Sequence, residues 1–151
     1  MNDKTNTTPA KSARHRAREL ALQGLYQWRI AGTDVRQIEK TTRDEKSLGR
    51  YDVELFIQLL RGAVNQQEKL SEVITPHLDR PLSELSPVEF SVLLLGAYEL
   101  VNLPEVPYRV IINEGVELAK TFGGSDGHKF VNGVLDKMAA QLRAVEVSSK
   151  N

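Results

Sequence analysis

The run from Val88 to Leu100 constrains the fold of this chain more than any other segment, because it is apolar on nearly all sides. Ser86 and Pro87 precede it as a cap and first-turn pair, and Glu89 stands at the third helical position of a capping box. A helix that is apolar all round is usually the buried centre of its domain. We therefore expect other helices to surround this one.

Apolar residues recur at helical spacing on both sides of this run. The expected helices run from Ser12 to Gly32, from Asp34 to about Lys40, from Asp52 to the residue before Pro76 with a polar stretch at 65–69 that allows a kink, from Pro107 to Gly123, and from Ser125 or Asp126 to Leu142. The polar stretch up to Arg50 is typical of a loop. No segment alternates with period two between hairpin turns, so no sheet is expected. The sequence predicts an all-α fold, a single compact bundle of about six or seven helices.

Length and composition fit one globular domain. The 151 residues are 40% hydrophobic and 26% charged, which separates the chain from disordered proteins. We expect residues 12–145 to form a helical domain between a flexible polar tail at 1–11 and a flexible C-terminal tail at 146–151. The sequence has no cysteine, no secretory signal and no apolar run that approaches the ~20 residues of a membrane span. A cytoplasmic protein without a membrane partner is the simplest interpretation.

Charge is distributed unevenly, although Lys plus Arg and Asp plus Glu both number 20. Residues 1–50 carry 11 basic and 6 acidic side chains, an excess of five positive charges. Residues 51–151 carry 9 and 14, an excess of five negative charges. A chain polarised in this way can offer one surface to phosphate and another to a basic protein.

No pattern predicts catalysis, a metal site or a cofactor. The three histidines, His15, His77 and His128, are scattered, and no acidic pair stands out by its spacing. The segment 123–129 contains three glycines but lacks the second motif glycine, the hydroxyl residue and the preceding strand of a nucleotide-binding loop. It is typical of a helix stop followed by a new cap. The alternative interpretation is that this loop and the backbone N–H groups of the helix that follows it bind an anion.

The start of the first helix predicts a phosphate-binding surface. On a helical wheel Lys11 and Arg18 flank the apolar stripe with His15 beside them, whereas Arg16 points away. Four cations between positions 11 and 18 meet no acid there, and they occupy first turns, where the helix dipole disfavours positive charge. Helix stability does not explain them, but phosphate binding does, because guanidinium groups grip phosphate oxygens bidentately.

Basic and aromatic side chains alternate around the second glycine-containing turn, as Lys120, Phe122, Lys129 and Phe130. Phe130 lies about 80° from the centre of the apolar face of its helix, an edge position that leaves a ring free to stack on an unpaired base. Phe122 fits the core equally well. Because stacking needs splayed bases, this combination favours single-stranded over duplex nucleic acid.

Five segments together resemble a known family. They are Ala13–Glu19 (ARHRARE), Leu25–Trp28 (LYQW), Ala97–Leu100 (AYEL), Val106–Glu114 (VPYRVIINE) and His128–Asp136 (HKFVNGVLD). In this order they strongly resemble the NusB family of bacterial transcription antitermination factors, over about residues 12–142. The resemblance implies an all-helical RNA-binding protein that is not an enzyme. It also implies pairing with NusE, a small-subunit ribosomal protein, and binding to the boxA element of nascent ribosomal RNA. With other Nus factors, such pairs keep RNA polymerase elongating.

The resemblance also implies roles for individual residues. The implied RNA-binding residues are Arg14, His15, Arg16, Arg18, Lys120, Phe122, Lys129, Phe130 and Asn132. The implied NusE-facing residues are Tyr26, Arg80, Glu84 and Glu89. The charge count agrees, since residues 84–117 hold one base, Arg109, and six acids: Glu84, Glu89, Glu99, Glu105, Glu114 and Glu117. An acidic surface suits a basic ribosomal protein.

The sequence departs from the family pattern at two places. His15 interrupts the arginine run, so the charge there depends on pH near neutrality. Leu94 and Leu95 occupy the region where many relatives carry an arginine, which places any role of that arginine in doubt.

Two alternative functions remain. The same helical module precedes a ribosomal RNA methyltransferase in other proteins, and a self-associating interaction domain, such as a homodimer, could pair the basic strip with the acidic half of another copy.

Overall fold

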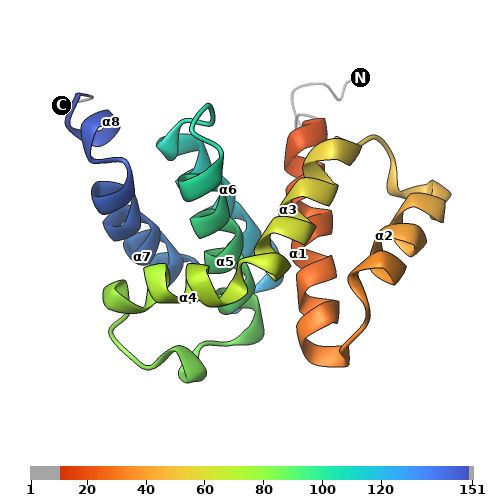
Figure 1. Ribbon diagram of the computed structural model, residues 1–151, viewed down its shortest axis with the longest axis horizontal. Coiled ribbons are helices and arrows are strands. Elements are labelled where there is room, and N and C mark those ends of the chain that lie inside the picture. Colours follow the sequence, from red (N-terminus) through yellow and green to blue (C-terminus); the bar gives the residue numbers. More distant parts are fainter. Residues whose placement is uncertain (1–10, 150–151) are drawn as a thin grey trace, which may run out of the picture.

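The computed structural model describes residues 11–149, and every regular element in this range is a helix (Figure 1). The α-helices are α1 (Ala13–Ala31), α2 (Val35–Asp44), α3 (Val53–Asn65), α4 (Gln67–Ile74), α5 (Pro87–Asn102), α6 (Tyr108–Phe122), α7 (Gly127–Leu142) and α8 (Ala144–Ser149). Three short 3-10 helices are η2 (Lys46–Leu48), η3 (Thr75–His77) and η4 (Leu82–Glu84). The all-α prediction is confirmed, with more helices than expected. None of the described helices is long and apolar enough to cross a membrane.

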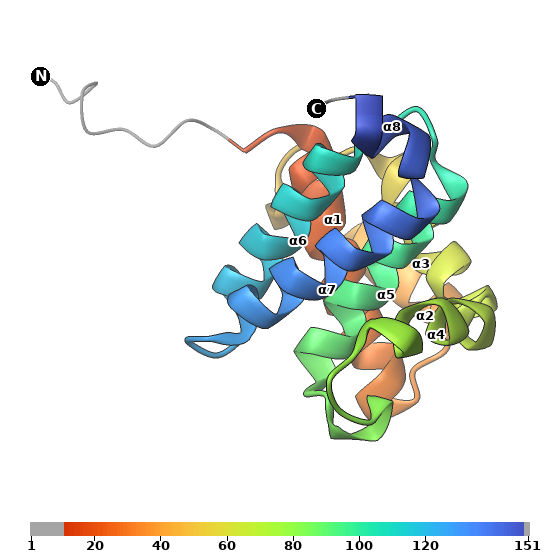
Figure 2. The same ribbon diagram turned by 90° about the vertical axis from the view of Figure 1, so that its left-hand side faces the viewer.

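Helix α5 is the centre of the bundle, as its apolar sequence predicts. Every residue from Phe90 to Leu100 is buried. Helices α1 and α3 contact it on one side, α6 and α7 contact it on the other, and α4 crosses its end (Figures 1 and 2). The core is therefore one continuous layer of aliphatic side chains around α5, which fixes the relative positions of α1, α6 and α7.

The predicted helix starts are confirmed at three caps. The Ser12 hydroxyl accepts the His15 backbone N–H at 2.9 Å, and the Asp52 carboxylate accepts the Leu55 N–H at 3.0 Å. Ser86 and Glu89 form the reciprocal capping box at 3.0 Å in each direction. These bonds satisfy backbone donors that have no partner within the helix.

Three boundaries differ from the sequence prediction. Helix α2 continues past Lys40 to Asp44 and η2 follows it, because the residues that looked like a loop are polar but compatible with an exposed helix. The long helix after Asp52 divides at Gln66 into α3 and α4. The Gln66 side chain accepts a 3.1 Å hydrogen bond from Asn102 at the end of α5. Where the polar stretch 65–69 allowed a kink within one helix, the structure has two separate helices.

Parts of both segments that the sequence assigned to tails, Lys11 and residues 146–149, are described by the structure. Residues 1–10 and 150–151 lie outside the described residues, but Lys11 is bonded to Glu19. At the other end, the chain from 146 to 149 belongs to α8, where Val147 packs against the core. The Glu146 carboxylate accepts the Tyr108 N–H at 3.0 Å and pairs with Arg143 at 2.7 Å. Residues 146–149, which the sequence assigned to a C-terminal tail, thus belong to a helix that contacts the start of α6.

Close contact of α5, α6 and α7 sets the position of the turn between α6 and α7. Leu135 of α7 is fully buried, and its two methyl groups point at glycines on the neighbouring helices. A Cβ at Gly96 would stand 2.6 Å from Cδ2, and a Cβ at Gly115 would stand 2.6 Å from Cδ1. A side chain at either glycine would collide with Leu135, so the two glycines allow α5, α6 and α7 to pack closely together.

Candidate nucleic-acid interface

The cations at the start of α1 are organised around one buried carboxylate, that of Glu19. Lys11 Nζ lies 2.9 and 3.1 Å from its two oxygens, Arg16 Nη1 lies at 3.0 Å, and His15 Nε2 lies at 3.4 Å. The Glu19 side chain is only 1% exposed. Burial alone would raise the pKa of Glu19, but the hydrogen bonds from Lys11 and Arg16 outweigh it and hold the pKa below its ordinary value.

Arg18 corrects the sequence prediction most clearly. Its guanidinium is buried and donates to both oxygens of Glu99 on α5, at 2.8 and 2.9 Å, with Glu114 of α6 at 3.4 Å. Burial would lower the pKa of Arg18, yet the hydrogen bonds and charge of Glu99 raise it. Arg18 joins α1, α5 and α6 inside the bundle, so it is not available to an RNA phosphate in this structure.

The remaining residues of the arginine run also have acidic neighbours. His15 Nδ1 lies 2.9 Å from Glu114 Oε1, and Arg14 Nη1 lies 3.8 Å from Asp52 Oδ2. The interpretation that these cations meet no acid was therefore wrong. The carboxylates come from α5, α6 and the start of α3, and from Glu19 one turn further along α1. Arg14 and Lys11 stay half or more exposed, whereas Arg16 and His15 are only partly so.

The second predicted region lies at the corner where α6 ends and α7 begins. Lys120 is exposed, 3.7 Å from Glu117, and Lys129 and Asn132 are exposed on α7. Asn132 lines a polar groove of about 370 Å³ between α6 and α7, together with Arg109 and Asn113. Two lysines and the Asn132 amide thus face solvent at or near this corner.

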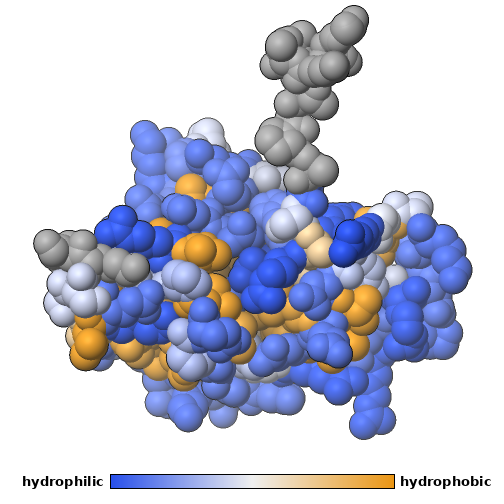
Figure 3. All heavy atoms as spheres, turned by 90° about the horizontal axis from the view of Figure 1, so that it is seen from above, coloured by the Kyte–Doolittle hydropathy of each residue, from blue (hydrophilic) through white to orange (hydrophobic). Residues whose placement is uncertain are grey.

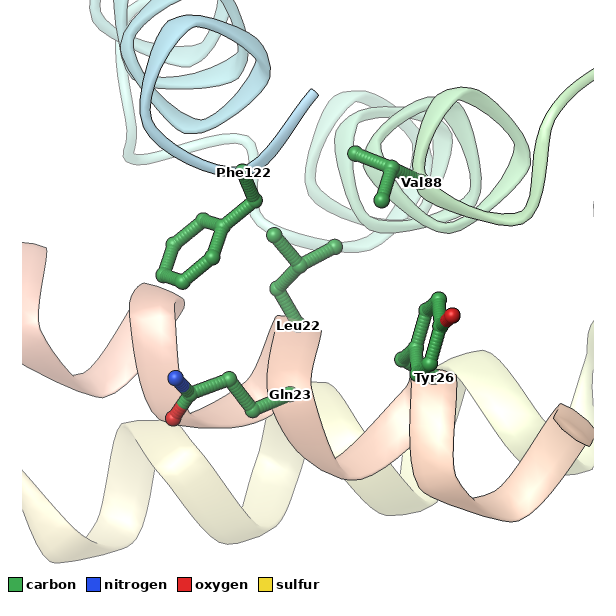
Figure 4. A pocket seen from close by; sticks show the side chains of 5 residues that line it. All are labelled: Leu22, Gln23, Tyr26, Val88 and Phe122. Atoms are coloured by element: carbon green, nitrogen blue, oxygen red, sulfur yellow. The ribbon is translucent and has the colours of Figure 1, made fainter. Parts of the chain in front are cut away.

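The two aromatic rings of the corner are less free than expected. Phe122 is half-buried and lines a pocket of about 260 Å³ with Leu22, Gln23, Tyr26 and Val88 (Figure 4). Phe130 is half-buried too, and the Arg80 guanidinium lies 4.2 Å from the centre of its ring. One face of Phe130 is therefore covered by a cation, held in turn by Asp79 at 2.9 Å. A stacked base would have to use the other face or displace Arg80.

Helices α1 and α6 bring both predicted regions to one side of the molecule. His15 near the start of α1 meets Glu114 in the middle of α6, and Leu22 in the middle of α1 shares a pocket with Phe122 at the end of α6. The helices thus run side by side in the same direction, as Figure 2 shows. The corner lies beside the middle of α1, about two helical turns from its basic start.

The residues expected to face NusE lie next to this surface. Tyr26 is 43% exposed and points toward Val88 at one end of the pocket, with Leu22 between it and Phe122 (Figure 4). Glu89 is half-buried in its capping box and lies beside Gly127, the first residue of α7. Glu84 is exposed on η4. The candidate partner surface therefore adjoins the aromatic corner.

The expected acidic surface is smaller than the sequence count indicates. Of the six acids between 84 and 117, Glu99 is buried against Arg18, Glu114 pairs with His15 and Arg18, and Glu89 caps α5. Glu84, Glu105 and Glu117 are exposed. Sequence reasoning missed Glu19, Glu99 and Glu114 as organisers of the basic start, although all three stand inside the segments that carried the family resemblance.

Among the described residues, no group of three or more His, Cys, Asp or Glu side chains could hold a metal ion.

The chain matches the NusB family over residues 15–140. It is 56% identical over 142 residues to the transcription antitermination protein NusB of Dechloromonas aromatica, which covers 94% of this chain and 87% of the relative. It is 57% identical over 142 residues to the NusB protein of Ralstonia nicotianae, covering 94% and 92%.

Solved structures agree with this match. NusB of T. maritima has a TM-score of 0.75 at 30% identity, covering 87% of this chain and 94% of that one. A complex of the antitermination factors NusB and NusE with double-stranded RNA contains a chain with a TM-score of 0.71 at 26% identity, covering 84% and 96%. The chain therefore belongs to the NusB family of transcription antitermination proteins.

Proposed function

We propose that this chain is a non-catalytic RNA-binding factor that, together with NusE, binds a boxA-like single-stranded element of nascent ribosomal RNA and supports processive elongation by RNA polymerase. Bacterial transcription takes place in the cytoplasm, so the proposal places the protein there. Other Nus factors and the polymerase would be reached through the complex with NusE and RNA.

The observation that carries this proposal is the shared side of the basic start of α1 and the α6–α7 corner. Lys11 and Arg14 are exposed at the start of α1, Lys120 on α6 and Lys129 in the first turn of α7, so a strand that contacts both regions would follow α6 beside α1. Arg16 and His15 support this surface while bonded to Glu19. Asn132 adds an amide that can pair with a base edge.

The arrangement also suggests how NusE and RNA would cooperate. Tyr26 and Phe122 line one pocket, so a partner side chain in that pocket would contact the same ring that borders the RNA surface. Arg80 covers Phe130 and stands next to Asp79. If NusE drew Arg80 away from Phe130, the ring would be opened to a base, which would raise RNA affinity.

The test is fluorescence anisotropy with a boxA-like single-stranded RNA, with and without NusE. Three or four phosphate contacts give a log–log salt slope of roughly −2 to −3. Arg14→Gln with Lys129→Gln should make this slope shallower, whereas the matched control Lys69→Gln with Lys137→Gln, on α4 and α7, should not. No binding, or a flat salt titration, would refute the proposal. Light scattering with and without RNA tests self-association, and a dimer that ignores RNA would favour that alternative.

A further inference from the structure

Of the five excess positive charges in residues 1–50, three belong to the start of α1 and two belong to the segment 36–50. At the start of α1, the cations Lys11, Arg14, Arg16 and Arg18 are balanced by four carboxylates, those of Glu19, Asp52, Glu99 and Glu114. Three of these carboxylates come from outside residues 1–50, so the charge at the start of α1 is largely neutralised by other parts of the fold. The segment 36–50, which spans most of α2, η2 and the turn that follows, contains five cations and three carboxylates.

Two of those carboxylates are already neutralised by specific partners. Glu39 is buried and accepts from Arg61 of α3 at 2.6 and 2.8 Å. Asp44 pairs with Lys40 at 2.7 Å. The third, Glu45, accepts the Ser47 backbone N–H at the start of η2.

Four exposed cations remain in this segment, and within the described range none of them forms an ion pair: Arg36, Arg43, Lys46 and Arg50. We call this set the α2 basic surface. Arg36, Lys40 and Arg43 are spaced by four and three residues, so they share one face of α2. The part of the molecule around α2 is mostly hydrophilic on the face in Figure 3.

A stabilising effect on the helix accounts for only some of the cations in the α2 basic surface. Arg43 stands in the last turn of α2, where a cation is favourable. Arg36 stands in the first turn, where a cation is unfavourable and no acid accompanies it. Both guanidinium groups help to lower the pKa of Glu39, after the larger effect of the Arg61 hydrogen bond, so they converge on the same side of α2.

The α2 basic surface is continuous with the start of α1. Arg16 Nε donates to the Leu48 carbonyl at 3.3 Å, and the Asp52 N–H donates to the Ala13 carbonyl at 3.0 Å. The turn that carries Lys46 and Arg50 therefore lies against the first turn of α1. Within the α2 basic surface, Lys46 and Arg50 are therefore nearest to the start of α1, and Arg43 and Arg36 follow along α2.

We propose that the α2 basic surface binds the phosphates of the RNA strand that extends beyond the segment held by α1 and the α6–α7 corner. This inference rests on the proposed function and enlarges its RNA footprint. Exposed guanidinium groups without a carboxylate partner suit phosphate oxygens, to which they can donate two parallel hydrogen bonds. Continuity with the RNA surface favours RNA over an acidic protein as the ligand.

The test compares two RNAs on the full chain. One is a boxA-like single-stranded RNA, and the other carries about ten additional uridines at its 5′ or its 3′ end. The variant is Arg36→Gln with Arg43→Gln, which leaves the Arg61–Glu39 and Lys40–Asp44 pairs in place. The control, Lys69→Gln with Lys137→Gln, removes the same charge from α4 and α7. Circular dichroism and thermal unfolding establish that each variant is folded.

We expect the wild type and the control to bind one of the extended RNAs more tightly than the short one. The α2 variant should lose that gain, with an affinity about threefold to thirtyfold lower. Its salt slope should become shallower by about 1.4, which corresponds to two phosphates on a single strand. Its affinity for the short RNA should stay unchanged.

The outcomes separate this inference from the proposed function. If the wild type binds neither RNA, the proposed function fails and the inference fails with it. If the wild type binds the short RNA but gains nothing from extension at either end, only the α2 inference is overturned. The same holds if the α2 variant keeps the full gain, or loses affinity with an unchanged salt slope.

Discussion

Replacing Arg18 by alanine is expected to destabilise the fold before it affects RNA. The Arg18 and Glu99 side chains are 4% and 3% exposed, and two hydrogen bonds of 2.8 and 2.9 Å join them. Arg18→Ala would leave the Glu99 carboxylate charged and unpaired in the interior. Breaking a buried pair in this way costs about 3–5 kcal/mol.

That loss is large for a domain of this size. Native domains are stable by about 5–15 kcal/mol, so Arg18→Ala would remove a third or more of a typical value. At roughly 2–4 °C per kcal/mol, the unfolding temperature should fall by about 6–20 °C. The measurement is urea and thermal unfolding followed by circular dichroism. Arg14→Ala is the control, because its half-exposed guanidinium stands 3.8 Å from Asp52 and should change stability by less than about 1 kcal/mol.

A double substitution distinguishes the pair from simple loss of side-chain packing. Arg18→Met with Glu99→Leu replaces both charges by apolar groups of similar volume and should recover most of the stability lost in Arg18→Ala. Two results would refute the reasoning. One is a loss below about 1 kcal/mol for Arg18→Ala, and the other is a double variant no more stable than the single one.

Removing the Glu19 carboxylate by Glu19→Gln should weaken RNA binding several-fold although it deletes a negative charge, because the neighbouring cations lose the group that positions them. The exposed Glu117→Gln removes the same charge as a control, and tighter RNA binding by Glu19→Gln would contradict the expectation. The folded pKa of Glu19 lies below its ordinary value of 4.5, so its carboxylate stabilises the fold above that pH and the contribution is lost as pH falls through the lower folded pKa. Urea unfolding from about pH 6 to about pH 3 should therefore bring the wild type and Glu19→Gln together at the acid end. Gly96→Ala should lower the free energy of unfolding by about 1–3 kcal/mol, because the new methyl group would collide with Leu135, whose other methyl group already packs against Gly115. The control Gly133→Ala should not destabilise the fold, because the space around Gly133 is open.

The basic start of α1 differs from a simple row of exposed arginines. Its cations are fixed by carboxylates from α1 itself and from other helices, so they are ordered before any ligand arrives. Ordering in advance lowers the entropy cost of binding, but it also reduces the net charge at this place. In our proposal the α2 basic surface, made of Arg36, Arg43, Lys46 and Arg50, supplies the exposed positive charge that the start of α1 lacks.

The sequence by itself determined the helical class, most helix starts and the central position of α5. These features depend on local rules: a serine cap at Ser12, a capping box at Ser86, a left-handed glycine at Gly32, and the period of the apolar residues. The order of the family segments also identified the candidate RNA and partner regions. Whether each of those residues contacts RNA or NusE stays a prediction.

The tertiary structure decided which charges remain exposed. Arg18 meets Glu99 and Glu114 across 81 and 96 residues of sequence, and Arg80 reaches Phe130 from another segment. Periodicity describes one helix at a time, so it cannot show a carboxylate supplied by a distant helix. Burial then makes such a pair decisive, because an unpaired charge in the core is too costly to persist. For that reason Arg18 became part of the core, whereas Arg36, Arg43, Lys46 and Arg50 stay exposed without an ion pair.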